Sequence, residues 1–192
     1  MTTEQILALV PGGVLSIALA TVLVLVIVNF RRRNGVALAV SGALIAAGLV
    51  FLLVLHPGVP PILGMVIAVL GSVVAIVGGD PATRRLLAFT AADGVLREGP
   101  HGGILLRPAA GKTSADEVLR GGMLIGYLER TAAVFTIIAG FGEGLALLIA
   151  LKGIGRFSEL AAPEARERFI IGTLASLLWA CVVAVIVRLS IT

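Results

Sequence analysis

The chain has 192 residues, of which 58% are hydrophobic and only 14% are charged. Because soluble domains carry roughly 25% charged residues, this composition excludes an ordinary soluble protein and indicates a membrane protein. The net charge of +4 would suggest a nucleic-acid partner in a soluble protein, but here the basic residues flank apolar runs, where they orient a chain in a bilayer. We therefore expect the lipid bilayer as a partner, and no nucleic acid.

Five apolar runs are long enough to cross a bilayer, which requires about 20 residues. They cover approximately residues 6–30, 36–55, 62–79, 123–151 and 169–187. We predict an all-α, polytopic membrane bundle of about five transmembrane helices, forming a single membrane domain over residues 1–192. The single cysteine, Cys181, lies within the last run, so no internal disulfide and no cysteine-based metal site are expected.

The first run ends at three arginines, and the second ends at His56-Pro57-Gly58, which predicts a tight hairpin into the third. The third run repeats small residues at helical spacing, which lets another backbone approach closely. This stripe can serve dimerisation or packing inside the bundle, and we favour packing inside the bundle. Its members are Gly64, Ala68, Gly71 or Ser72, Ala75 and Gly79.

An inner loop is predicted over about residues 80–122. Asp80 and Pro81 have the types typical of an N-cap and of the first helical position. We therefore expect a short amphipathic helix over 82–92, with Arg84 and Arg85 facing water. Glycine, proline and scattered charge favour an irregular loop after it.

The fourth run carries Glu143 inside it, where a carboxylate is costly in hydrocarbon and therefore suggests function. Glu129 and Arg130 lie near its start, and we expect them at the membrane interface. In one continuous helix, Glu129 and Glu143 would share a face with small residues, because steps of three and four separate them. One interpretation makes Glu143 a proton or cation site; the favoured one makes it a structural polar group, protonated or paired with a nearby basic residue. That face carries Gly122, Gly126, Glu129, Ala133, Thr136, Gly140, Glu143, Leu147 and Ala150, and the candidate partners are Lys152, Arg156 and Arg168.

The fifth run follows a charged approach and has its own four-residue stripe of small side chains, which suits close helix crossing. The stripe consists of Gly172, Ser176, Ala180 and Ala184. Trp179 lies near the middle of the run, so we expect it to serve packing.

The distribution of basic residues predicts an orientation. Three of the fifteen Lys and Arg residues follow the first run, seven lie from Arg84 to Arg130, four lie between the last two runs, and Arg188 comes last. With five spans, an outside N-terminus puts eleven of them inside and four outside, as the positive-inside rule prefers. The C-terminus is then cytoplasmic. If the fourth run were re-entrant, the connection after it would fall inside and the topology would change.

Three sequence blocks, GYLER at 126–130, LKGIGRFSEL at 151–160 and ERFIIGTLASLLWA at 167–180, lie within residues 121–184. This region resembles the C-terminal membrane segment of an uncharacterised bacterial family, the proteins with domain of unknown function 3307, and related actinobacterial small membrane proteins. The resemblance implies a multi-pass protein of the bacterial cytoplasmic (inner) membrane and a polar hairpin, but no activity. The residues it groups together are Glu129, Arg130, Lys152, Arg156, Phe157, Glu159, Gly172 and Thr173, beside which the hairpin also holds Glu167 and Arg168.

No nucleophile, acid–base pair or metal-ligand set stands out in the sequence, so we expect no enzyme, no metal and no cofactor. The favoured function is a structural, assembly or accessory component whose polar hairpin packs within the chain, against a second copy or against another membrane protein. The alternative is a small proton- or cation-conducting channel or transporter that uses Glu143.

Overall fold

The computed structural model describes residues 3–32, 35–90, 104–105, 117–118, 122–155, 157 and 163–192. Six helices account for nearly all of these residues, so the predicted all-α class is confirmed for them. Two short segments pair as antiparallel strands, with Ile104 opposite Val118. The elements are α1 (Thr3–Arg32), α2 (Gly35–Leu55), α3 (Pro61–Thr90), β1 (Ile104–Leu105), β2 (Glu117–Val118), α4 (Gly122–Ile138), α5 (Glu143–Gly155) and α6 (Pro163–Ile191).

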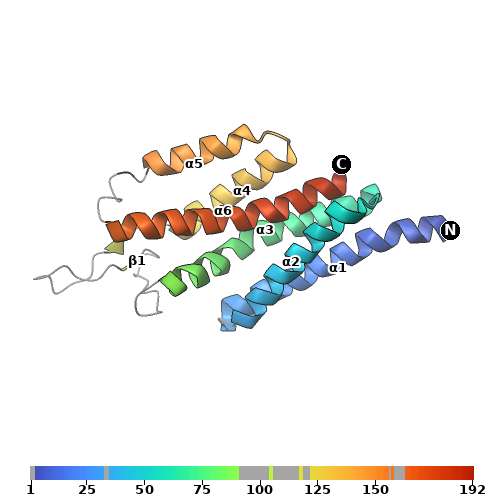
Figure 1. The fold of residues 1–192 in the computed structure, drawn as a ribbon, viewed down its shortest axis with the longest axis horizontal. Helices are drawn as coiled ribbons and strands as arrows, with labels where there is room; N and C mark the ends of the chain where they lie inside the picture. Colours follow the sequence, from blue (N-terminus) through green and yellow to red (C-terminus); the bar gives the residue numbers. More distant parts are fainter. Residues whose placement is uncertain are drawn as a thin grey trace, which may run out of the picture.

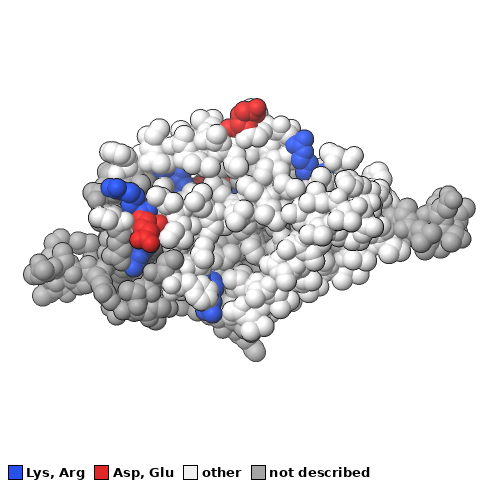
Figure 2. Space-filling model, viewed as in Figure 1, with Lys and Arg blue, Asp and Glu red and all other residues white. Residues whose placement is uncertain are grey.

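Four of the described helices are long and apolar enough to cross a membrane: residues 9–31, 35–55, 61–89 and 165–191. They coincide with the first, second, third and fifth predicted runs. The outer surface seen in Figure 2 consists largely of uncharged residues, with the charged ones in small groups. Length, composition and this surface support a membrane-embedded protein.

Helices α3 and α6 run antiparallel through the middle of the bundle (Figure 1). The α1–α2 hairpin lies on one side of this pair, and the α4–α5 hairpin lies on the other. Both chain termini lie at the same end, which we call the terminal end; there Gly64 of α3 approaches the backbone of Ser190 in α6. The opposite end, where α3 ends and α4 and α6 begin, we call the loop end.

The core is apolar and is formed mainly by α1, α3 and α6. Buried side chains recur every three to four residues along α1, which places them on one face toward the central pair. Gly71 of α3 permits a close approach, because a methyl group there would overlap the side chain of Val187. The largest fully buried side chains are Val22, Val26, Ile67, Val74, Val183, Ile186 and Val187.

The prediction of one continuous span over 123–151 is wrong, because α4 ends at Ile138. Gly140 follows with a positive φ of 76°, a conformation that glycine adopts at no steric cost. The amide of Phe141 donates to Thr136 O at 2.8 Å, and the amide of Gly140 donates to Ile137 O at 3.1 Å. This bond pair is a Schellman C-cap, and it turns the chain so that α5 runs back toward the loop end.

The short amphipathic helix predicted for the inner loop is not a separate element. Helix α3 continues through Pro81 to Thr90, so the described part of residues 80–90 is helix and not loop. Pro81 removes one hydrogen bond, to the carbonyl of Val77, but α6 packs on both halves of α3 and holds them in line. Asp80 accepts a hydrogen bond from Arg84 Nε at 2.8 Å and so supports the turn around the proline.

Candidate functional site

Arg130 of α4 lies at the junction of α3, α4 and α6 and is only 2% exposed. Its Nε donates to the carbonyl of Ile76 at 2.6 Å, and its Nη1 donates to Ser176 Oγ at 2.8 Å. The guanidinium therefore joins three helices through bonds made in a region of low dielectric. Charge-assisted hydrogen bonds of this kind are roughly twice as strong as neutral ones.

Glycines make room for this arginine. A methyl group on Gly79 would overlap Arg130 Cδ, and one on Gly126 would lie 3.1 Å from Arg130 Nη1. Gly78, beside Gly79, is filled by the ring of Trp179, whose Nε1 donates to Val74 O at 3.1 Å. The Gly78-Gly79 pair is thus a notch in α3 that receives one side chain from α4 and one from α6.

A second buried contact joins the two helices of the α4–α5 hairpin. Glu129, next to Arg130, forms an ion pair with Lys152 of α5, and both side chains are largely buried. The Lys152 ammonium also lies 5.6 Å from the ring centroid of Phe169 in α6, a cation–π geometry. The ion pair fixes the end of α5 on α4 and orients it toward α6.

Three buried polar atoms at the same junction have no hydrogen-bond partner among the described residues: Arg130 Nη2, Thr83 Oγ1 and Thr173 Oγ1. Thr173 lies one helical turn from Ser176 on α6. Thr83 lies one turn from Gly79 on α3, and its methyl group is 3.5 Å from the position of a Cβ on Gly172. The three atoms therefore come from neighbouring turns of three packed helices.

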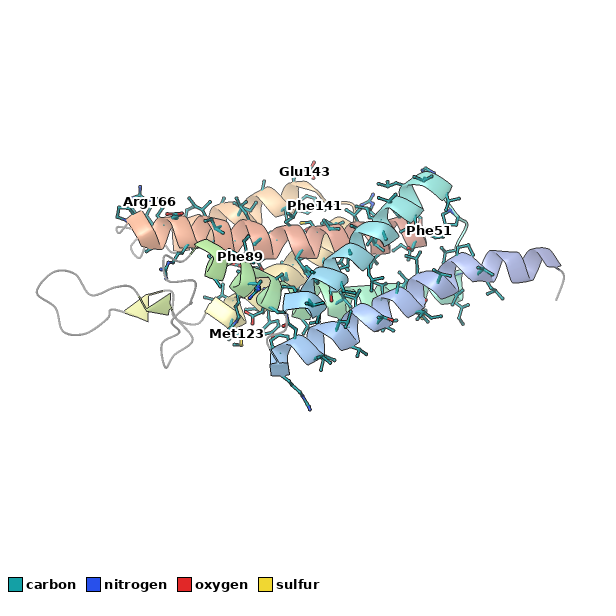
Figure 3. All side chains as sticks on the ribbon, turned by 60° about the horizontal axis from the view of Figure 1, so that its bottom comes forward. Phe51, Phe89, Met123, Phe141, Glu143 and Arg166 are labelled. Carbon is teal, nitrogen blue, oxygen red and sulfur yellow. The ribbon has the colours of Figure 1, made fainter. Side chains whose placement is uncertain are left out.

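Glu143 lies far from this junction, at the exposed turn of the hairpin (Figure 3). It is the first residue of α5, where a carboxylate interacts favourably with the positive end of the helix dipole. The position that the sequence predicted for it, inside a continuous span, was wrong because the chain turns at Gly140. Arg188 of α6 packs beside this turn: its Nη1 donates to Ile137 O at 2.7 Å and so satisfies a carbonyl at the end of α4.

The structure brings together most of the predicted hairpin residues and separates others. Glu129, Arg130, Lys152, Thr173, Ser176 and Gly126 gather at the junction. Exposed Glu167 and half-buried Arg168 lie in the first turns of α6, at the loop end, and Gly140 forms the turn. Gly64, Gly71 and Ala75 are buried and Ala68 is half-buried on α3, while Gly172 packs against Thr83 and Leu87. Arg156 and Glu159 lie outside the described residues.

Sequence reasoning placed Gly79 in a packing stripe but missed its contact with Arg130, the carbonyl of Ile76 and the hydrogen bond of Trp179. It treated Asp80 as a helix cap and Trp179 as packing, whereas Trp179 donates a hydrogen bond across to α3. The sequence signal was the adjacent pair Gly78-Gly79, which leaves a gap on the helix surface that large side chains from other helices can enter.

No group of three or more His, Cys, Asp or Glu side chains that could hold a metal occurs in the part of the chain that the structure describes. The junction offers two carboxylates, each bonded to a cation, and three cations: Arg84, Arg130 and Lys152. Comparisons with protein-family models, with curated proteins and with solved structures find no match.

Proposed function

We propose that this chain is an integral membrane protein of the structural, assembly or accessory class, and that α5 is the surface on which a membrane partner packs. The observation that carries the proposal is the uneven burial of the α4–α5 hairpin. Helix α4 is held to α3 and α6 by Arg130, whereas Gly144 is the only buried residue of α5. Because α5 is largely exposed while α4 is fixed to the bundle, another helix can pack against α5.

The length of α5 supports a partner. Its 13 residues extend about 20 Å, short of the roughly 30 Å of a bilayer core, so α5 does not span on its own. Its exposed residues combine small side chains, Ala146 and Ala150, with large apolar ones. Small residues allow close helix contact in lipid, where packing and not the hydrophobic effect holds helices together. The large exposed side chains are Leu147, Ile149, Leu151 and Ile154.

The polar residues of the hairpin support the same class. Glu129 and Lys152 pair α4 with α5, and Arg130 bonds to α3 and α6, which supports a role in fixing the hairpin inside the chain. The transport alternative depended on Glu143 lying in the bundle interior, and its position at an exposed turn gives that alternative no support. The proposal includes no enzymatic activity.

The proposal includes a revised orientation in the bacterial cytoplasmic membrane. Because the hairpin returns, α1, α3 and α5 all end at the loop end, where α2, α4 and α6 begin. In the sequence, fourteen of the fifteen Lys and Arg residues lie between these helix ends or within about two turns of them. Among the described Lys and Arg residues, only Arg188 lies toward the terminal end. The positive-inside rule then favours a cytoplasmic loop end and both termini outside. Single cysteines introduced at Thr2 and Thr192 of a Cys181→Ser protein should react with a membrane-impermeant maleimide in intact cells; protection of either one contradicts this orientation.

Crosslinking tests the partner surface. In a Cys181→Ser background, Leu147→Cys of α5 and Val50→Cys of α2 are matched probes, because the native side chains are 59% and 57% exposed. Oxidation in native membranes should give a discrete disulfide-linked species for Leu147→Cys, at twice the monomer mass if the partner is a second copy. Val50→Cys should stay monomeric. Equal crosslinking of both probes, or none at Leu147→Cys, contradicts the proposal.

A further inference from the structure

The junction of α3, α4 and α6 contains more hydrogen-bond donors than the described residues use. Arg130 and Thr173 are 2% and 7% exposed, yet Arg130 Nη2 and Thr173 Oγ1 have no partner among the described groups. Leaving a buried polar group unpaired costs about 1–3 kcal/mol, and more for a charged one. Thr83 Oγ1 adds a third such atom on the facing helix.

The two threonines differ from seven other described hydroxyl residues. Seven described Ser and Thr hydroxyls donate to a backbone carbonyl three or four residues earlier in the chain, as Thr131 does to Tyr127 O and Thr136 to Ala133 O. The other five are Ser16, Thr21, Ser41, Ser190 and Thr192. Thr83 and Thr173 do not make this bond, so their hydroxyl protons remain available to a ligand at the junction.

The charge balance of the junction favours an anion. Three cations face two carboxylates there, and each carboxylate already accepts from a cation: Asp80 from Arg84, and Glu129 from Lys152. Arg130 is left with two neutral acceptors, a carbonyl and a hydroxyl. Asp80 and Glu129 also attract the Arg130 charge through space, but each already accepts a hydrogen bond from another cation. An anion bound at Nη2 would offset the remaining cost of burying this guanidinium.

We propose that the α3–α4–α6 junction binds a small monovalent inorganic anion, such as chloride, through Arg130 Nη2 and the hydroxyls of Thr83 and Thr173. An anion can accept from all three donors, whereas a water molecule has two lone pairs and carries no charge. All three atoms are enclosed by protein, which favours a single small ion over a phosphate group attached to a lipid. The site is independent of whether α5 binds a partner.

The only tryptophan of the chain, Trp179, reports on this site. It lies one turn after Ser176 on α6, and its ring fills the notch at Gly78 beside the Gly79–Arg130 contact. In purified protein kept in gluconate, iodide should quench its fluorescence with saturation, and chloride should compete. Quenching that rises linearly with iodide, with no effect of chloride, would overturn the proposal, because it would indicate collision alone.

The matched variants are Thr83→Val/Thr173→Val and Thr131→Val/Thr136→Val. Valine keeps the shape of threonine, and the first pair removes hydroxyls that bond to nothing in the described protein, so the fold should persist; circular dichroism in gluconate checks this. The first pair should weaken apparent halide affinity at least tenfold, whereas the second should leave it unchanged. Halide affinity equal to the parent protein in the first pair overturns the proposal. Should that pair fail to fold, chloride must still raise the thermal midpoint of the parent protein above its value in gluconate, or the proposal fails.

Discussion

The two helical hairpins of this protein are attached to the same central pair of helices by different means. The α1–α2 hairpin packs on α3 and α6 through apolar side chains such as Leu19, Val22 and Ile45. The α4–α5 hairpin is attached through cations: Arg130 bonds to both central helices, and Arg188 of α6 bonds back to the end of α4. Apolar packing in lipid tolerates small changes of shape, whereas a buried cation requires its acceptors. We therefore expect the second hairpin to be the more sensitive to single substitutions.

The largest effect is expected from breaking the ion pair of the α4–α5 hairpin. Lys152→Met leaves Glu129 charged and buried without its partner, which should destabilise the protein by about 3–5 kcal/mol. The double variant Glu129→Met/Lys152→Met removes both charges and should recover most of that loss. Unfolding by sodium dodecyl sulfate in mixed micelles measures both.

The control for this pair is Arg85→Met, which removes an exposed cation that lies 4.9 Å from the ring centroid of Phe89. Its loss should be below about 1 kcal/mol. If Lys152→Met were as mild as this control, or the double variant as unstable as the single one, the ion pair would not hold the hairpin.

The same substitution should have opposite effects in the two regions. Gly79→Ala would push a methyl group into Arg130 and should destabilise the protein by about 1–3 kcal/mol. Gly48→Ala on α2 would place its methyl group 3.5 Å from Leu15 Cδ2, an ordinary contact, beside a small apolar cavity. This substitution should stabilise the protein by about 0.5–1 kcal/mol, because alanine has a higher helix propensity than glycine. The cavity has a volume of about 10 Å³ and is lined by Leu15, Ala18, Leu19, Val22, Leu44, Ile45, Gly48 and Ile186.

Thermal unfolding in detergent compares the two glycine variants directly. A loss of stability in Gly48→Ala equal to that in Gly79→Ala would show that both hairpins are packed equally tightly. The contrast between apolar and polar attachment would then be wrong.

The turn of the α4–α5 hairpin gives a smaller effect. Gly140→Ala forces an L-residue into a left-handed conformation and places a methyl group 2.8 Å from Arg188 Nη1. The expected loss is about 1–2 kcal/mol. Gly142→Ala is the control, because no atom lies within 4 Å of its Cβ position, and it should change stability by less than about 0.5 kcal/mol. Hydrogen exchange should show that Gly140→Ala loosens α5 and leaves α1 and α2 unchanged.

Four of the helices could be predicted from the sequence because each apolar run is long and is bounded by charge or by a turn. The errors came from local signals that compete with hydropathy. Gly140 ends a helix within an apolar run, and a count of apolar residues over the run does not detect one left-handed residue. Pro81 predicted a helix start, but packing of α6 on both halves of α3 overrides the lost hydrogen bond.

The candidate site could be predicted only in part. Glu129 and Arg130 of α4 stood out because charge in an apolar run is rare, but they were expected at the membrane interface and are instead buried at the junction. Their acceptors were not, since Ile76 contributes a backbone carbonyl and Ser176 was assigned to a packing stripe. Which residues of α3 face α4 depends on how the three helices are rotated against one another, and the apolar pattern of α3 leaves that rotation open.

The smallest effect is expected at Glu143, the residue for which the sequence suggested a transport role. As the first residue of α5, at an exposed turn, its carboxylate interacts with the helix dipole and with none of the junction residues. Glu143→Gln should therefore cost below about 1 kcal/mol, decreasing with added salt because exposed charges are screened. Arg130→Gln at the buried junction should lose clearly more, and in gluconate salts, which supply no halide, that loss should not depend on ionic strength. In liposomes, a proton or cation flux that depends on Glu143 and is abolished by Glu143→Gln without unfolding would contradict this assignment and restore the transport hypothesis.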